Sequence, residues 1–228
     1  MFKQKLTFKN SRNLNLSAVF EGEDKDAPVI VMCHGFHSSK DNPISTGALA
    51  QKLVKRGLCV FRFDFTGHGQ SEGTIDEITP LGALDDLECA AKIVGKRDFA
   101  LYGSSFGGYV SLLYARQNPV LALALKAPVS DWNTARVSTN RGIKFRQETK
   151  NIGIYKLAEN IKTPTLIIHG DQDDVVPFSQ SQKLYDSLRC NKKLEIIEGA
   201  NHDIRSKDLE RANVLIAEFF KEKLLTHP

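Results

Sequence analysis

Short apolar runs alternate with segments of helical periodicity along most of this chain, and this alternation limits the possible folds most strongly. Unbroken apolar runs are typical of strands that are buried on both faces. Strands that alternate with helices predict a mostly parallel sheet with right-handed crossovers and with helices on both faces, an α/β fold. The predicted strands are 29–33, 58–63, 99–102, 121–125, 165–168 and 194–197, and the predicted helices are 44–56, 81–94, 106–117, 179–188 and 207–225.

Two further strands are predicted before the first of these runs. Residues 3–8 and 13–20 alternate polar and apolar side chains, as the strands of an antiparallel hairpin do. With them the predicted sheet has eight strands. At 228 residues the chain fits one domain, 1–228, in which a short cap insertion at about 130–160 interrupts the alternation. We expect this cap at the C-terminal edge of the sheet.

The distribution of charge and hydropathy argues against several classes of protein. The net charge of +4 is spread along the chain, whereas nucleic-acid-binding proteins concentrate Lys and Arg in one patch. No run approaches the ~18 apolar residues that cross a membrane, and the N-terminus lacks the apolar core of a signal peptide. We therefore expect no nucleic-acid partner, no membrane association, a cytoplasmic location, and a monomer or a homodimer.

The four cysteines do not have the spacing of a metal site. Cys33, Cys59, Cys89 and Cys190 are scattered and form no CxxC pair. Cys33 and Cys59 lie inside predicted strands, so we expect them to be core residues. The sequence therefore predicts neither a metal nor an organic cofactor.

The segment 103–108 carries the strongest local signal for catalysis. It reads GSSFGG, which fits the pattern G-x-S-x-G, and it connects a predicted strand to a predicted helix. In this motif a sharp turn holds the central serine in a strained backbone conformation, and flanking side chains larger than glycine would collide. Ser105 is therefore the candidate nucleophile, with Gly103 and Gly107 needed for the turn. A serine hydroxyl still requires a base and a group that orients the base.

The candidate base and acid lie in the loops after the last two predicted strands. His202 follows the strand 194–197 and is the candidate general base. Asp171, Asp173 and Asp174 follow the strand 165–168. One buried carboxylate suffices to fix the tautomer of the histidine, and the pattern of residues alone does not choose among the three.

An oxyanion formed during attack on a carbonyl needs two backbone N–H donors. The N–H of Phe106 opens the helix after Ser105, and the N–H of Phe36 lies in the turn after the strand 29–33. We predict that these two groups form the oxyanion hole. His68 is expected to brace its glycine-rich turn, and His34 and His169 to make structural hydrogen bonds.

The chain order Ser, Asp, His, with these strand and helix contexts, resembles the α/β-hydrolase superfamily over about 14–225. Three further segments support the resemblance. The turn HGF at 34–36 looks like the family's oxyanion turn, DFTGHGQS at 64–71 looks like its D-x-x-G-x-G-x-S loop, and 169–177 matches HGxxDxxVP. In this last pattern the acid falls on Asp173. The nearest resemblance is to small microbial carboxylesterases of the cinnamoyl or feruloyl esterase kind.

The resemblance implies a serine hydrolase that works without a cofactor through an acyl-enzyme intermediate. We expect it to cleave small-molecule carboxylic esters of short or aromatic acyl groups. The alternative is a serine peptidase of the prolyl-oligopeptidase type that acts on small peptides, since such enzymes share the G-x-S-x-G-G turn. A lipase is less favoured because residues 133–160 are polar.

The cap insertion is also predicted to be basic. It contains Arg136, Arg141, Lys144, Arg146 and Lys150. A basic surface attracts acidic substrates, but a solvated cap face is the simpler interpretation of these residues.

Overall fold

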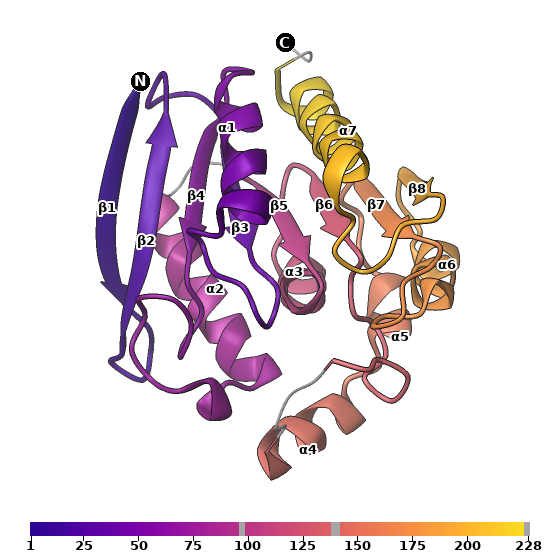
Figure 1. The fold of residues 1–228 in the computed structure, drawn as a ribbon. Helices are drawn as coiled ribbons and strands as arrows, with labels where there is room; N and C mark the ends of the chain where they lie inside the picture. The colour runs from indigo at the N-terminus through magenta and orange to yellow at the C-terminus, as the bar shows by residue number, and fades with distance from the viewer. Residues whose placement is uncertain (96–98, 138–141, 226–228) are drawn as a thin grey trace.

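An eight-stranded sheet forms the centre of the computed structural model, which describes residues 1–95, 99–137 and 142–225 (Figure 1). The strand order is β1-β2-β4-β3-β5-β6-β7-β8. The pairs β1·β2 and β2·β4 are antiparallel and all the other pairs are parallel, which confirms the mostly parallel sheet and its leading hairpin. The strands are β1 Phe2–Lys9, β2 Asn15–Gly22, β3 Val29–Cys33, β4 Cys59–Phe63, β5 Phe99–Ser104, β6 Leu123–Lys126, β7 Thr165–Gly170 and β8 Lys192–Ile197.

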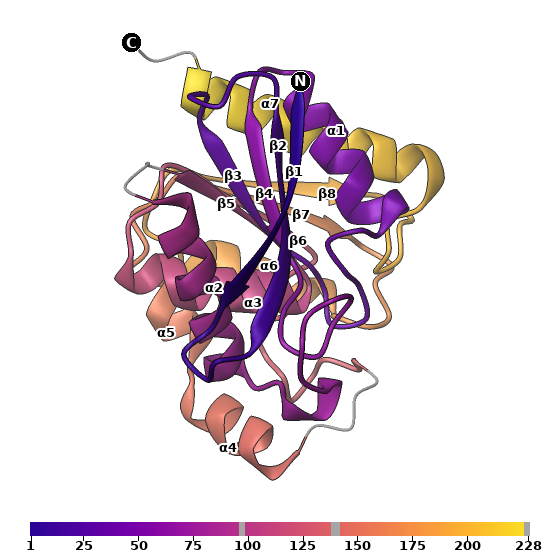
Figure 2. The same cartoon turned by 90° about the vertical axis from the view of Figure 1, so that its left-hand side faces the viewer.

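Helices cover both faces of the sheet, as predicted. Figure 2, which views the sheet from the side of β1, shows α1 and α2 on opposite sides of the strands. The helical segments are η1 Pro43–Gly47, α1 Ala48–Val54, η2 Ile75–Glu77, α2 Pro80–Val94, α3 Phe106–Gln117, α4 Ile143–Asn151, α5 Ile154–Ala158, α6 Phe178–Ser187 and α7 Ser206–Leu225. Helices α1 and α7 pack on one face, and α2, α3 and α6 pack on the other.

The central strand β3 explains why the apolar runs are unbroken. Ile30 and Met32 face the core under α1 and α7, whereas Val31 and Cys33 face the core under α2 and α3. Because both faces are covered, every residue of β3 is buried and apolar. The expected core positions of Cys33 and Cys59 are confirmed.

The last strand and the first helix differ from the prediction. The run 194–197 was predicted to be buried on both faces, but β8 pairs only with β7 at the edge of the sheet, and Ile196 is 41% exposed. The helix predicted at 44–56 begins as the π-helical turn η1, and α1 ends at Val54. The Asn42 side chain accepts hydrogen bonds from the N–H groups of Ile44 and Ser45, which caps this start.

The cap insertion contains two short helices and packs against the core through a buried aromatic side chain. In Figure 1, α4 lies beyond the carboxyl ends of the parallel strands. Phe145 of α4 is buried, with its ring centroid 4.9 Å from that of Trp132 and 6.3 Å from that of Phe106. The basic residues Arg136, Lys144, Arg146 and Lys150 are exposed, which agrees with the expected solvated face of the cap, whereas Phe145 attaches α4 to the core. Residues 138–141, which include Arg141, lie outside the described residues.

Among the described helices, none is long and apolar enough to cross a lipid bilayer.

Candidate active site

Ser105 occupies a strained turn between β5 and α3. Its φ of 52° lies in the left-handed region that residues with a side chain rarely adopt. The neighbouring backbone explains the glycines: a Cβ on Gly103 would lie 2.5 Å from the carbonyl oxygen of Gly107, and a Cβ on Gly107 would lie 2.2 Å from that of Cys33. The turn therefore requires glycine at both positions, as the sequence predicted.

The structure brings Ser105, His202 and Asp173 into contact in series. The Oγ of Ser105 lies 3.0 Å from Nε2 of His202, and Nδ1 of His202 lies 2.7 Å from Oδ2 of Asp173. Asp171 instead accepts a hydrogen bond from the Gly199 N–H at 2.7 Å, and Asp174 is exposed. Of the three adjacent carboxylates, Asp173 is the one that touches the histidine.

Asp173 is held as a buried anion by four hydrogen bonds. Its Oδ1 accepts from the N–H groups of Val175 and Val176 at 2.9 and 2.8 Å, and its Oδ2 accepts from His202 and from Nε2 of His169 at 2.9 Å. Burial alone raises the pKa of Asp173, but the bonds from His169 and His202 outweigh it and hold the pKa well below its usual range. The carboxylate is therefore ionised at neutral pH.

His169 has a larger part in this arrangement than the sequence indicated. It was expected to make structural hydrogen bonds, and it does so with Ser181 at 2.6 Å and the carbonyl oxygen of Val176 at 2.9 Å. Its contact with the same oxygen of Asp173 that faces His202 was not anticipated. The signal was its place four residues before Asp173 in the HGxxDxxVP segment.

The backbone of the turn after β3 lies beside Ser105. A Cβ on Gly35 would meet the Cβ of Ser105 at 3.4 Å. Within the described chain, neither the N–H of Phe36 nor that of Phe106 donates to a protein acceptor. Both groups are thus available to an oxygen that forms next to Ser105.

His34 fixes the peptide group that carries the Phe36 N–H. Its Nδ1 donates to the carbonyl oxygen of Gly35 at 2.8 Å, and its Nε2 accepts from the N–H of Phe65 at 3.2 Å. Burial, followed by the neighbouring His68, lowers the pKa of His34 to about 4. The ring is therefore neutral, which matches one donating and one accepting nitrogen.

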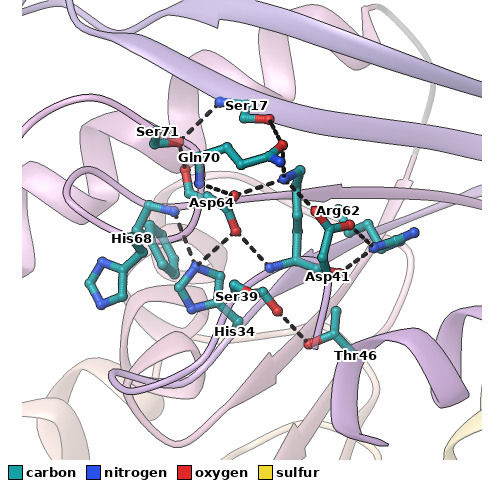
Figure 3. A network of polar contacts seen from close by, with 12 residues as sticks. Ser17, His34, Ser39, Asp41, Thr46, Arg62, Asp64, His68, Gln70 and Ser71 are labelled. Atoms are coloured by element: carbon teal, nitrogen blue, oxygen red, sulfur yellow. Dashed lines mark hydrogen bonds and ion pairs between the residues drawn. The ribbon is translucent and has the colours of Figure 1, made fainter. Parts of the chain in front are cut away.

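A buried polar network also holds the turn after β3 (Figure 3). Asp64 accepts from the N–H of Lys40 at 2.7 Å, from Nζ of Lys40 at 2.9 Å and from the N–H of Gln70 at 2.9 Å. His68 was expected to brace its own turn. Its Nε2 also lies 2.5 Å from the carbonyl oxygen of Phe36. The loops after β3 and β4 are thereby joined to each other.

A cleft of about 830 Å³ opens beside Ser105 and His202. It is bounded by the loop that leads to α1, by the loop that leads to α7 and by part of the cap insertion. Among the described residues, no group of three or more His, Cys, Asp or Glu side chains is arranged to hold a metal ion.

A family model described as the alpha/beta hydrolase fold matches residues 28–142, about half of the chain. The chain belongs to the α/β-hydrolase fold family. A second model, described as serine aminopeptidase, S33, matches residues 132–208 of this α/β hydrolase. The resemblance expected from the motifs is thus confirmed at the level of family and fold.

Curated relatives and solved structures agree with this family. The α/β hydrolase is 28% identical over 186 residues to the uncharacterized protein YfhR of Escherichia coli O157:H7, with 78% of this chain and 64% of that protein covered. It is 25% identical over 226 residues to the mitochondrial palmitoyl-protein thioesterase ABHD10 of Bos taurus, with 83% and 71% covered. Est1E from Butyrivibrio proteoclasticus, solved with ferulic acid, superposes with a TM-score of 0.85 at 22% identity over 96% of this chain and 98% of that one. The chain thus spans less than two thirds of the length of the first curated relatives.

Proposed function

We propose that this protein hydrolyses carboxylic esters with Ser105 as nucleophile, His202 as general base and Asp173 as the group that orients the base. The observation that carries the proposal is the unbroken series of contacts, at 3.0 and 2.7 Å, from the Ser105 hydroxyl through the His202 ring to a buried carboxylate. Such a series converts a weak hydroxyl nucleophile into a strong one.

The reaction follows from the positions of these groups. Nε2 of His202 accepts the hydroxyl proton as Oγ of Ser105 bonds to the ester carbonyl carbon. The carbonyl electron pair moves onto oxygen, where the N–H groups of Phe36 and Phe106 stabilise it. The bond to the alcohol then breaks, and the alcohol leaves with the proton from the imidazolium. Water repeats the cycle on the acyl-enzyme and releases the acid.

We further propose short or aromatic acyl groups as substrates. Phe36 and Tyr102 are among the residues that line the cleft beside Ser105, which supports an aromatic acyl group. The related fold of Est1E was solved with ferulic acid, an aromatic acid, and this is consistent with the same substrate class.

The test is to replace each of two adjacent serines. Ser105→Ala should lower kcat for p-nitrophenyl acetate by about 10⁴-fold or more, and should abolish covalent labelling by a fluorophosphonate. Ser104→Ala removes the neighbouring hydroxyl but keeps the proposed nucleophile Ser105, so labelling should persist in that control. Labelling that survives Ser105→Ala in protein with an unchanged circular dichroism spectrum would refute the assignment.

A peptidase is the second candidate, because residues 132–208 match the serine aminopeptidase model. A peptidase and an esterase would share the same three residues and differ in the leaving group. Comparing aminoacyl p-nitroanilides with p-nitrophenyl esters separates the two. A larger kcat/KM for the anilides would favour the peptidase.

A further inference from the structure

Lys126 is a buried cation at the rim of the proposed reaction centre. It is the last residue of β6 and pairs in register with Ser104, and its carbonyl oxygen accepts a hydrogen bond from the N–H of Ser105 at 2.9 Å. Ala124, two residues earlier on the same face of the strand, packs in the core under α7. The Lys126 side chain thus lies on the α7 side of the sheet, where it lines the cleft with Ser105 and His202 although it is only 5% exposed.

The charge of Lys126 is only partly balanced by the described residues, because Asp203 and Asp173 act on it without forming an ion pair. Its Nζ donates to the backbone carbonyl oxygen of Asp203 at 3.1 Å, and no carboxylate of the described chain lies within 4.0 Å of it. Lys40, the other buried lysine of the described residues, differs: its Nζ lies 2.9 Å from Asp64 and 2.8 Å from Asp41. A buried ammonium without a counter-ion is costly, so an anion from outside the chain would be stabilised beside it.

Protonation of Lys126 at neutral pH agrees with this picture. Burial lowers the pKa of the ammonium to about 8, and the more distant Asp203 and Asp173 oppose that change. The protonated form therefore predominates near pH 7.

The other charged side chains of the cleft do not supply the missing anion. Arg136 and Arg205 also line it, and Asp203 is the one acidic residue of the lining among the residues that the structure describes. The Asp203 carboxylate is already bound by Arg205, at 2.5 and 3.0 Å. The described lining thus contains three cationic side chains and one carboxylate that is itself paired, so it carries an excess of positive charge.

We propose that this cleft takes esters that carry a second, anionic group such as a carboxylate, and that Lys126 binds this group. The inference rests on the proposed function for the ester bond and adds the substrate class. Asp203 follows His202 directly in the chain, so an anion at Nζ of Lys126 would lie beside the loop that holds the base. The carboxylate belongs either to the acyl part or to the alcohol part of the ester, and the substrates below distinguish these.

A purely structural role for Lys126 makes a different prediction. The contact of Nζ with the Asp203 carbonyl oxygen ties the end of β6 to the His202 loop. If this tie were the only role, removing the amine would lower activity equally for charged and for neutral esters. The ratio of the two activities is therefore the decisive measurement.

The kinetic test uses two matched pairs of esters. The acyl pair is p-nitrophenyl hydrogen adipate and its neutral isostere p-nitrophenyl 6-methylheptanoate, and the alcohol pair is 4-carboxyphenyl acetate and 4-isopropylphenyl acetate. Lys126→Met should lower the charged-to-neutral ratio of kcat/KM at least about tenfold in one pair, equivalent to about 1.4 kcal/mol. Lys126→Arg, which keeps the charge, should retain most of the ratio. Lys55→Met removes the same charge from an exposed position outside the cleft and should leave the ratio unchanged.

A binding test makes the result independent of turnover. Calorimetric titration of monomethyl adipate into Ser105→Ala protein should show binding that weakens at least about tenfold in the Ser105→Ala, Lys126→Met double variant. Such binding would support the anion site even if the wild-type protein cleaved no ester. A lack of ester cleavage would contradict the proposed function but not the anion site. Equal loss of both esters in each pair, or equal binding by the two variants, would overturn the anion site.

Discussion

The buried pair of Asp64 and Lys40 predicts a large loss of stability when only its anionic member is removed. Their side chains are 0% and 1% exposed, and Asp64 accepts three hydrogen bonds that join the loops after β3 and β4. Asp64→Asn keeps the shape of the side chain but leaves the Lys40 ammonium with only the half-exposed Asp41 as counter-ion. Breaking a buried pair in this way costs about 3 to 5 kcal/mol.

The expected change is large enough for a thermal melt. For a domain of about this size, 1 kcal/mol changes the melting temperature by roughly 2 to 4 °C, so Asp64→Asn should melt at least about 6 °C lower. Glu210→Gln is the matched control because Glu210 pairs with Lys52 while 61% exposed, and it should change the melting temperature by less than about 2 °C.

A double variant tests the cause. If an unpaired buried charge is the reason, Lys40→Met combined with Asp64→Asn should be more stable than Asp64→Asn alone, since both charges are then gone. A melting temperature of Asp64→Asn close to that of the wild type, or a double variant no better than the single one, would refute this reasoning.

Two further predictions concern Asp173. Asp173→Asn should lower kcat for p-nitrophenyl acetate by roughly 10⁴-fold. Asp171→Asn and Asp174→Asn alter carboxylates that do not touch His202, so each should change kcat by less than about fivefold. Similar losses in all three variants would contradict the assignment of Asp173. Because the folded-state pKa of Asp173 is depressed, its ionised form stabilises the protein above the unfolded value of 3.8 and loses this effect as the pH falls toward the folded value. The difference in melting temperature between wild type and Asp173→Asn should therefore narrow from pH 6 to pH 3, and a gap that stays constant would contradict it.

The sequence predicted the sheet well because strands that are buried on both faces appear in it as continuous apolar runs. The runs that became β3, β4 and β5 are continuous because each face of these strands meets a helix layer. The meeting of three distant loops was also predictable, since the carboxyl ends of parallel strands lie at one edge of the sheet. Ser105, Asp173 and His202 each follow such a strand end.

The features that the sequence did not reveal depend on long-range contacts. Asp173 differs from its acidic neighbours through the N–H groups of Val175 and Val176 and through His169, none of which changes the local composition. Phe145 is the one aromatic residue of the mostly polar α4, so its burial could be seen only once Trp132 was placed beside it. Lys126 looks like an ordinary polar residue at the end of an apolar run, and its burial depends on the fold of α7.

The close approach of Gly107 to the carbonyl oxygen of Cys33 has a consequence for how this protein can change its substrates. At Gly107 the start of α3 lies against the backbone of Cys33 and His34 at the end of β3, so main-chain contact helps to set the spacing of the two peptide groups proposed to hold the oxyanion. Replacing lining side chains that do not hold these peptide groups, such as Val137 or Leu209, should therefore alter which ester is accepted while the distance between the proposed nucleophile and oxyanion donors stays the same. We therefore expect selectivity and turnover to vary independently when those positions are replaced.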